Sequence, residues 1–337
     1  MSSPGRLQPV LSVRDLSVEF RTDDGVVRAV DSVSFSVAEN ETLGIVGESG
    51  SGKSVTSLAI LGLLPTSAEV TGEITLRGEQ LLTKSDNEMR HIRGSRIAMV
   101  FQDALAALNP VYRVGYQVVE AIRVHHDVSA AEARKRAIEL LDIVGIPEPV
   151  RRFSQYPHEF SGGMRQRAMI AMSLANDPEV LIADEPTTAL DVTIQAQVLE
   201  VFERIQERTK SSLILITHDL GVVAGVADRV LVMYAGRQVE YGSVDDVFYR
   251  TAHPYGQGLL SSLPRVDRRL GGERLHRIKG QPPSLIHLPP GCAFNPRCPY
   301  ARPGSCDVQR PELHEVAIGH SSSCLFADEL MIREVAS

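Results

Sequence analysis

The sequence predicts an α/β fold whose core is a doubly wound parallel sheet, and two observations carry this prediction. Short apolar strands recur at Thr42–Val46, Val180–Ala183 and Leu213–Thr217, and helical stretches lie between them, as expected where crossover helices join parallel strands. A glycine-rich loop also joins the first strand to a helix, at residues 47–54. With 337 residues, 43% of them apolar and 23% charged, the chain is long enough to bury a large core.

The first elements are strands. From Leu11 to Val37 apolar and polar residues alternate in two runs, and Asp23-Asp24-Gly25 separates the runs. This pattern predicts an antiparallel hairpin. After the strand Thr42–Val46 and the glycine-rich loop, the segment Val55–Leu63 has the composition of a helix that ends before Pro65.

A helical insertion interrupts the sheet. Another strand is predicted at Ile97–Phe101, and the chain is then largely helical from Ala104 to Asp177. Ser129 and Glu132 have the spacing of a capping box, so we expect a helix to start there and to end near Gly145. The strand Val180–Ala183 resumes the sheet, and a periodic helical stretch follows at Thr193–Arg208.

The composition and the periodicity of the sequence change beyond Tyr249. Pro- and Gly-rich strings replace regular periodicity, among them Gly271-Gly272, Gln281-Pro282-Pro283 and Pro289-Pro290-Gly291. We therefore predict a domain at 1–248 and a loop-rich extension at 249–337.

Charge and hydropathy exclude some classes of protein. The net charge of −7 and the pI near 5.8 argue against a nucleic-acid partner. The longest apolar stretch, Val55–Leu64, is about half the length that crosses a bilayer. Met1–Val10 lacks the features of a secretion signal, so we expect a cytoplasmic protein.

The glycine-rich loop predicts a phosphate-binding site. It fits G-x-x-x-x-G-K-[ST] and reads Gly47, Glu48, Ser49, Gly50, Ser51, Gly52, Lys53, Ser54. Its glycines allow backbone N–H groups to converge on phosphate oxygens at a helix N-terminus. Lys53 would reach the β- and γ-phosphates of ATP, and Ser54 would bind Mg²⁺. The alternative is a Gly/Ser turn before a helix, but at average glycine frequency the four fixed positions of the motif arise by chance in roughly one such chain per hundred.

A pair of carboxylates follows the buried strand Val180–Ala183. Asp184 can hold Mg²⁺ through its water shell, and Glu185 can act as the general base on an attacking water. Such a pair could instead be the start of a helix, but Pro186 and the companion motifs favour hydrolysis. Gln102, at the end of one strand, could contact Mg²⁺ or the water, and His218, at the end of another, is a further catalytic candidate.

Ser161-Gly162-Gly163-Met164-Arg165-Gln166-Arg167 resembles the signature motif of the ABC ATPases. Phe160 and Met164 depart from the commonest form of this motif. The resemblance covers about Leu11 to Gly242 and implies a P-loop NTPase (RecA-like) core, an antiparallel β subdomain and a helical signature subdomain at about 104–177. It also implies roles for several residues: Phe20 stacks on adenine, Gln102 is the Q-loop glutamine, Ala189-Leu190-Asp191 is the D-loop, and His218 is the switch histidine.

The resemblance implies that two cassettes work face to face. Ser161, Gly162 and Gly163 would then contact ATP held by the partner cassette, since a helix N-terminus offers N–H groups to a γ-phosphate. ATP would act as a clamp that hydrolysis reopens. The loop Gln102–Pro110 would pass this motion to a membrane partner.

Further strings resemble the D-type ATPases of dipeptide/oligopeptide importers: Phe101-Gln102-Asp103, Leu108-Asn109-Pro110, His158 to Met164, and His253-Pro254-Tyr255. This resemblance implies a motor for peptide uptake, peripheral on the cytoplasmic face of the cell membrane. Its implied partners are a second, paralogous ABC ATPase subunit, two transmembrane permease subunits and an extracytoplasmic peptide-binding protein. Import of nickel or glutathione and a soluble, non-transport ABC ATPase remain alternatives. A P-loop kinase does not explain Ser161–Arg167.

Four cysteines lie in the extension, with five, seven and seventeen residues between them: Cys292, Cys298, Cys306 and Cys324. A reducing cytosol disfavours disulfides, so the thiols suggest a metal site. Structural zinc prefers close Cys pairs, which are absent, whereas the extension resembles one that can hold a [4Fe–4S] cluster. Zinc and unligated cysteines remain alternatives. If the site is structural, we expect Cys298→Ser to loosen the extension and leave nucleotide binding nearly unchanged.

Overall fold

The computed structural model describes residues 9–103, 107–188, 191–262 and 277–331. Ala189 and Leu190 of the predicted D-loop, Gly271-Gly272 and part of the predicted coupling loop lie outside these ranges. The chain forms two compact units. Unit 1 comprises 1–12, 36–42 and 75–216, and unit 2 comprises 13–35, 43–74 and 217–337.

Unit 1 contains a parallel sheet. Strand β7 (Val180–Asp184) pairs on one side with β6 (Ile97–Val100) and on the other with β8 (Ser212–Thr217). Every residue of β7 and β8 is buried, and helix α8 (Val192–Thr209) connects these two strands. The predicted parallel α/β arrangement is confirmed here.

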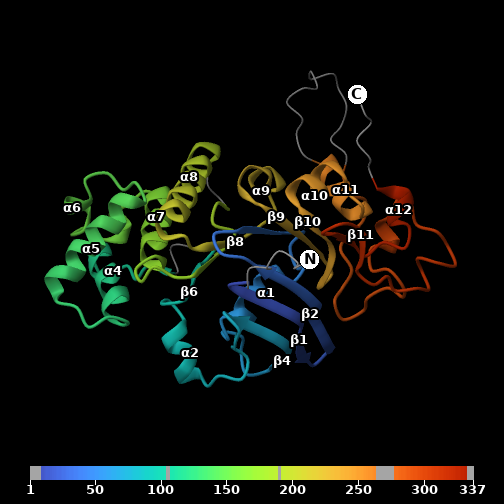
Figure 1. The fold of residues 1–337 in the computed structure, drawn as a ribbon, viewed down its shortest axis with the longest axis horizontal. Coiled ribbons are helices and arrows are strands. Elements are labelled where there is room, and N and C mark those ends of the chain that lie inside the picture. Colours follow the sequence, from blue (N-terminus) through green and yellow to red (C-terminus); the bar gives the residue numbers. More distant parts are fainter. Residues whose placement is uncertain (1–8, 104–106, 189–190, 263–276, 332–337) are drawn as a thin grey trace, which may run out of the picture. The chain divides into compact units, whose positions relative to one another are not determined.

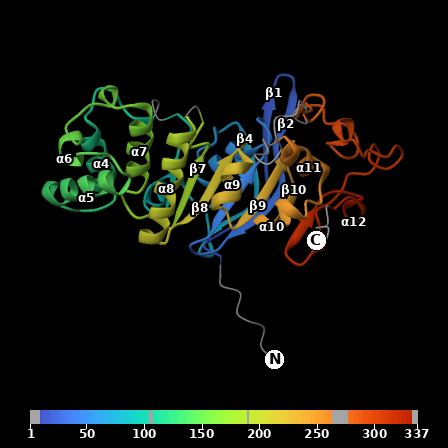
Figure 2. The same ribbon diagram turned by 90° about the horizontal axis from the view of Figure 1, so that it is seen from above.

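The rest of unit 1 is mostly helical. Helices α4, α5 and α7 pack on one another, and Figures 1 and 2 both show them as one group with α6. The Ser129 hydroxyl accepts the Glu132 N–H at 3.2 Å, and the Glu132 carboxylate accepts the Ser129 N–H at 3.0 Å, so the predicted capping box is confirmed. The remaining elements of unit 1 are β5 (Glu79–Gln80), α2 (Asp86–Ile92), α4 (Val114–Arg123), α5 (Ala130–Ile143), α6 (Pro149–Arg152), a 3₁₀ turn (Pro157–Glu159) and α7 (Gly162–Ser173).

Most of a second sheet lies in unit 2. Its strand β1 (Leu11–Thr22) lies between β2 (Gly25–Val37) and β4 (Ala68–Leu76). Only Asp23 and Asp24 separate β1 from β2, and the Thr22 hydroxyl donates to the Gly25 carbonyl at 2.7 Å. The predicted hairpin is therefore present.

Five other strands of unit 2 pair side by side, and they include both the strand before the phosphate loop and strands from the C-terminal part of the chain. In the order β11-β12-β10-β9-β3, only the β9–β3 pair is parallel. These strands are β3 (Thr42–Val46), β9 (Arg229–Tyr234), β10 (Arg237–Ser243), β11 (His314–Ala317) and β12 (His320–Ser322). The helices are α1 (Lys53–Ile60), α9 (Leu220–Val226), α10 (Val244–Tyr249), α11 (Pro254–Ser261) and α12 (Ala327–Leu330), with a 3₁₀ turn at Asn295–Arg297.

The C-terminal extension therefore has more regular structure than its sequence suggests. Its strands β11 and β12 are only four and three residues long, too short for an alternating pattern to be visible. One hydrophobic core runs from Val46, next to the phosphate loop, through Tyr234 and Tyr255 to Phe294. None of the described helices combines the length and the apolar character that a membrane crossing requires.

Candidate functional site

The phosphate loop of unit 2 depends on glycine conformations. It lies between β3 and α1, and Gly50 and Gly52 have φ angles of +77° and +103°, which residues with a Cβ rarely adopt. A Cβ on Gly52 would lie 2.5 Å from the Ala29 carbonyl oxygen. The loop backbone is thus packed too closely at this point for any other residue.

The inside of the loop suits an anion. Lys53 is 5% exposed, and its Nζ donates to the carbonyl oxygens of Gly47 at 2.7 Å and Glu48 at 3.0 Å. The hydroxyl of Ser51 is buried and has no hydrogen-bond partner among the described residues. A buried ammonium, an unsatisfied hydroxyl and the N-terminus of α1 fit a phosphate group. Ser54 is exposed next to Lys53, where it can bind a metal ion.

In unit 1 the structure brings together two of the predicted catalytic residues. The Gln102 amide nitrogen donates to Glu185 Oε2 at 3.0 Å, and the Thr188 hydroxyl donates to the same oxygen at 2.9 Å. Glu185 has φ +47°, a conformation that costs free energy in a non-glycine residue and that often marks a functional site. Asp184, the last residue of β7, is 6% exposed. Thr188 was not predicted, although it follows the carboxylate pair closely in sequence.

The signature residues surround the N-terminus of α7. Ser161 is the N-cap, and its hydroxyl accepts the Met164 N–H at 3.3 Å. Gly162 is exposed, with open space where a Cβ would lie, whereas a Cβ on Gly163 would lie 2.8 Å from Ile194. Ser161 and Gly162 are therefore accessible to a ligand that approaches this helix end.

Three other predicted residues have defined positions. Asp191 caps α8, where its carboxylate accepts the Ile194 N–H at 3.0 Å. Phe20 is half-buried on β1, and His218 is exposed directly after β8. Their roles toward ATP remain predictions.

The four cysteines of unit 2 line one cavity, together with apolar residues that include Phe294 and Phe326. All four are free thiols. Burial raises the pKa of Cys292, and it raises the pKa of Cys298 and Cys324 to about 11.

Backbone N–H groups point at each of the four sulfurs. The Arg302 N–H donates to Cys306 Sγ at 3.4 Å. Backbone hydrogen bonds from Phe294, Tyr300 and Phe326 act to lower the pKa of Cys292, Cys298 and Cys324, in that order, although burial outweighs them. Such donors stabilise thiolate ligands. Among the residues that the structure describes, no group of three or more His, Cys, Asp or Glu side chains is placed to hold a metal ion.

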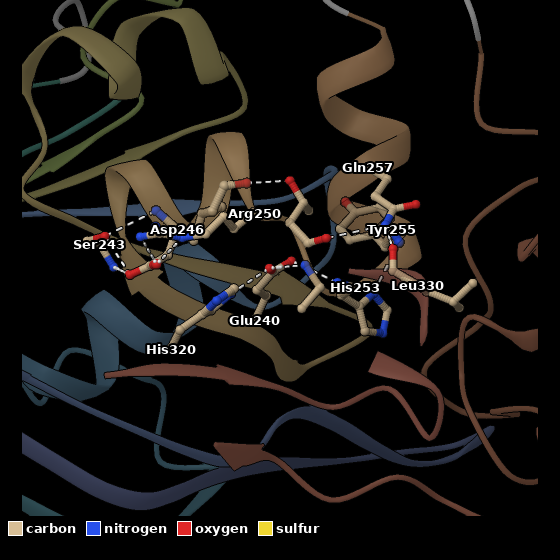
Figure 3. Close-up of polar contacts among 12 residues, drawn as sticks. Glu240, Ser243, Asp246, Arg250, His253, Tyr255, Gln257, His320 and Leu330 are labelled. Atoms are coloured by element: carbon tan, nitrogen blue, oxygen red, sulfur yellow. Dashed lines mark hydrogen bonds and ion pairs between the residues drawn. The ribbon is translucent and has the colours of Figure 1, made fainter. Parts of the chain in front are cut away.

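A buried carboxylate joins β10 to the extension, as Figure 3 shows. The Glu240 carboxylate accepts the N–H groups of Ala252 at 2.6 Å and His253 at 3.2 Å, and it lies 2.9 Å from His320 Nε2. Burial raises the pKa of Glu240. His253 Nδ1 in turn accepts the Tyr255 N–H at 3.1 Å, at the start of α11. Glu240 thereby fixes the segment that positions Tyr255.

Tyr255 is a functional candidate whose role the sequence did not reveal. Its hydroxyl accepts the N–H of Glu48, a residue of the phosphate loop, at 2.7 Å. The Glu48 side chain pairs with Arg297. The string His253-Pro254-Tyr255 was the only sequence signal for the first of these contacts.

Two family models match the chain: "ABC transporter" over residues 30–188 and "Oligopeptide/dipeptide transporter, C-terminal region" over residues 239–306. The dipeptide transport ATP-binding protein DppD of Bacillus subtilis is 54% identical over 325 residues, which are 96% of each chain. The oligopeptide transport ATP-binding protein OppD of Escherichia coli is 49% identical, over 94% of this chain and 92% of that one.

A solved structure is also similar. The ATP-binding cassette MJ0796, in a dimer that is described as a post-hydrolysis state bound to ADP and Pi, has a TM-score of 0.62 and 26% identity. The match covers 69% of this chain and 98% of the cassette.

Proposed function

Because this chain belongs to the ATP-binding proteins of dipeptide and oligopeptide ABC transporters, we propose that it binds and hydrolyses ATP to drive peptide uptake. The observation that carries the hydrolytic part is the Glu185 carboxylate, which Gln102 and Thr188 hold by hydrogen bonds of 3.0 and 2.9 Å. A carboxylate fixed in this way can accept a proton from an attacking water.

The phosphate loop supplies the binding half of this activity. Lys53 and the N-terminus of α1 would bind the β- and γ-phosphates, the exposed Ser54 would bind Mg²⁺, and Asp184 would reach the same ion through water. When bound, Mg²⁺ would neutralise charge that develops on the phosphates. Phe20 would stack on adenine, and His218 would contact the γ-phosphate.

We propose that two cassettes complete each ATP site. The exposed Ser161 and Gly162 at the start of α7 support this proposal, as does the dimeric assembly of the similar cassette MJ0796. The partners would be a paralogous ATPase subunit, two transmembrane permease subunits and an extracytoplasmic peptide-binding protein. The chain would then lie on the cytoplasmic face of the membrane.

The test is uptake of labelled di- and tripeptides by cells that express the whole transporter with Glu185→Gln. Loss of uptake is expected, because the amide cannot accept the proton. Glu207→Gln, the same change at an exposed position on α8, is the matched control and should transport normally. Unchanged uptake in Glu185→Gln would contradict the assignment of the base. Uptake of nickel or glutathione by cells that take up no peptide would contradict the peptide class.

We also propose that the four cysteines hold a [4Fe–4S] cluster. The convergence of the four thiols on one cavity and the N–H groups that point at their sulfurs support it. The cluster would tie the extension together.

Iron, labile sulfide and absorbance near 400 nm test the cluster in anaerobically purified protein. Cys306→Ser should lower all three readings, and Ser305→Ala, the neighbouring exchange, should leave them unchanged. Stoichiometric zinc without sulfide would instead favour a single-ion site.

A further inference from the structure

The C-terminal extension grips the phosphate loop at Glu48. The two guanidinium nitrogens of Arg297 donate to the two carboxylate oxygens of Glu48, Nη1 to Oε2 at 2.6 Å and Nη2 to Oε1 at 2.9 Å. From the other side, the Tyr255 hydroxyl accepts the Glu48 N–H at 2.7 Å. Paired bonds of this kind are among the strongest that side chains form. Arg297 is only 5% exposed and Glu48 27%, so water screens the pair little.

Arg297 and Tyr255, the two residues that contact Glu48, are themselves held in place by other contacts. Arg297 Nε donates to the Lys279 carbonyl at 3.1 Å, and Nη1 donates to the Tyr234 hydroxyl at 3.3 Å. The Tyr255 ring packs on the Tyr234 ring, with 4.6 Å between centroids. Neither side chain can leave Glu48 without breaking buried contacts.

The same residues connect the phosphate loop to the cysteine cavity. Arg297 immediately precedes Cys298. Phe294, whose N–H donates to Cys292, packs against Tyr255 at 5.5 Å between ring centroids. On the loop side, the Glu48 carbonyl accepts a hydrogen bond from Lys53 Nζ. One short path therefore runs from the thiols through the Arg297–Glu48 pair to the lysine that is placed to bind phosphate.

We propose that Arg297 and Tyr255 are positioning residues for the phosphate loop, and that the cysteine site sets ATP affinity through them. The proposal rests on the proposed function, because it requires ATP to bind this loop. An intact cysteine site fixes the backbone at Cys298 and hence Arg297. A disrupted site frees Arg297, and Glu48 and Lys53 lose their preorganised positions. We therefore expect Cys298→Ser to weaken ATP binding, in contrast to the expectation from sequence that it leaves nucleotide binding nearly unchanged.

The test is calorimetric titration of the purified, full-length chain with ATP and Mg²⁺. Arg297→Met should raise the Kd about tenfold, the effect of losing a charge-assisted hydrogen bond. Arg297→Lys should recover part of the loss, and Tyr255→Phe should raise the Kd about threefold. Arg250→Met is the matched control, because Arg250 also pairs with a carboxylate, that of Asp246, and does not line the cysteine cavity. Its Kd should stay at the wild-type value.

A double-mutant cycle separates positioning from a general loss of folding. Glu48→Gln combined with Arg297→Met should bind ATP no more weakly than Arg297→Met alone, whereas additive losses would overturn the role of the pair. Wild-type affinity in Arg297→Met would also overturn it. If Arg297→Met does not fold, Glu48→Gln on the loop side carries the test, with a Kd raised about tenfold.

The cysteine part of the proposal has its own outcome. Cys298→Ser should raise the ATP Kd as Arg297→Met does, and it should add little when combined with Arg297→Met. If the Kd is unchanged in Cys298→Ser but raised in Arg297→Met, only the control of ATP affinity by the cysteine site is overturned, and the role of Arg297 stands. Failure of the wild-type chain to bind ATP would instead contradict the proposed function.

Discussion

The phosphate loop and the C-terminal extension are built by different means. The loop depends on backbone conformation, with glycines at positive φ between a buried strand and a helix. The extension depends on buried polar side chains: Glu240 of β10 and His320 of the extension, which face each other, are each 0% exposed. A backbone motif therefore leaves a local pattern in the sequence, whereas a network of side chains from distant segments does not.

The largest expected effect comes from breaking the backbone motif. Gly52→Ala places a Cβ 2.5 Å from the Ala29 carbonyl oxygen at a φ of +103°, so the loop must deform. We expect the ATP Kd to rise at least about a hundredfold, measured by calorimetric titration. Gly319→Ala in the extension is the matched control, since its φ is +74° but nothing lies within 4 Å of the added Cβ. A normal Kd in Gly52→Ala would show that the loop does not need this conformation.

Features that depend on local backbone conformation could be predicted from the sequence, whereas contacts between distant segments could not. Strands β3, β7 and β8, the first hairpin and the capping box at Ser129 were all evident from local patterns, and the structure contains them. The helix predicted at Val55–Leu63 is found at Lys53–Ile60, because the chain turns at Gly62, where φ is +60°. Element ends depend on such single residues.

Sequence separation explains what was missed. The Tyr255–Glu48 and Arg297–Glu48 contacts span 207 and 249 residues, and no periodic pattern records contacts over such distances. The convergence of four cysteines could be suspected from their residue type, but not their N–H donors. Gln102 and Glu185 were each predicted at a strand end, and the parallel pairing of β6 with β7 explains why they meet.

The next effect is expected from the side-chain network of the extension. Glu240→Gln keeps the shape of the side chain but has one acceptor oxygen in place of two. It therefore cannot accept the N–H groups of both Ala252 and His253. A buried unsatisfied donor costs about 1–3 kcal/mol, so the free energy of unfolding in urea should fall by about 2 kcal/mol. Glu329→Gln, which breaks an exposed pair with Arg302, should cost at most about 0.5 kcal/mol. Equal losses in the two variants would show that the buried carboxylate has no special role in holding the extension.

The smallest effect is a difference in pH dependence between Glu240 and a carboxylate of unit 1. Although burial raises the pKa of Glu179, its hydrogen bonds to Arg96 and Arg77 outweigh burial and lower the pKa below 4.5. A lowered pKa means that the unfolded chain takes up the proton first as the pH falls. The stabilisation by Glu179 is therefore present above pH 4.5 and is lost as the pH falls through the folded-state pKa.

The pKa of Glu240 is shifted in the opposite direction, so its contribution to stability has the opposite pH dependence. Burial raises its pKa above 4.5, although His320 faces it, so its contribution is full below pH 4.5 and declines as the pH rises through the folded-state pKa. Urea unfolding of wild type, Glu179→Gln and Glu240→Gln across pH 4 to 7.5 tests this contrast. The loss caused by Glu179→Gln, about 0.5 kcal/mol near pH 7, should shrink toward pH 4, and the loss caused by Glu240→Gln should shrink toward pH 7.5. If the two variants instead show parallel pH profiles, the groups around Glu240 offset the effect of burial on its pKa. The Glu240 carboxylate would then be ionised where it contacts the extension.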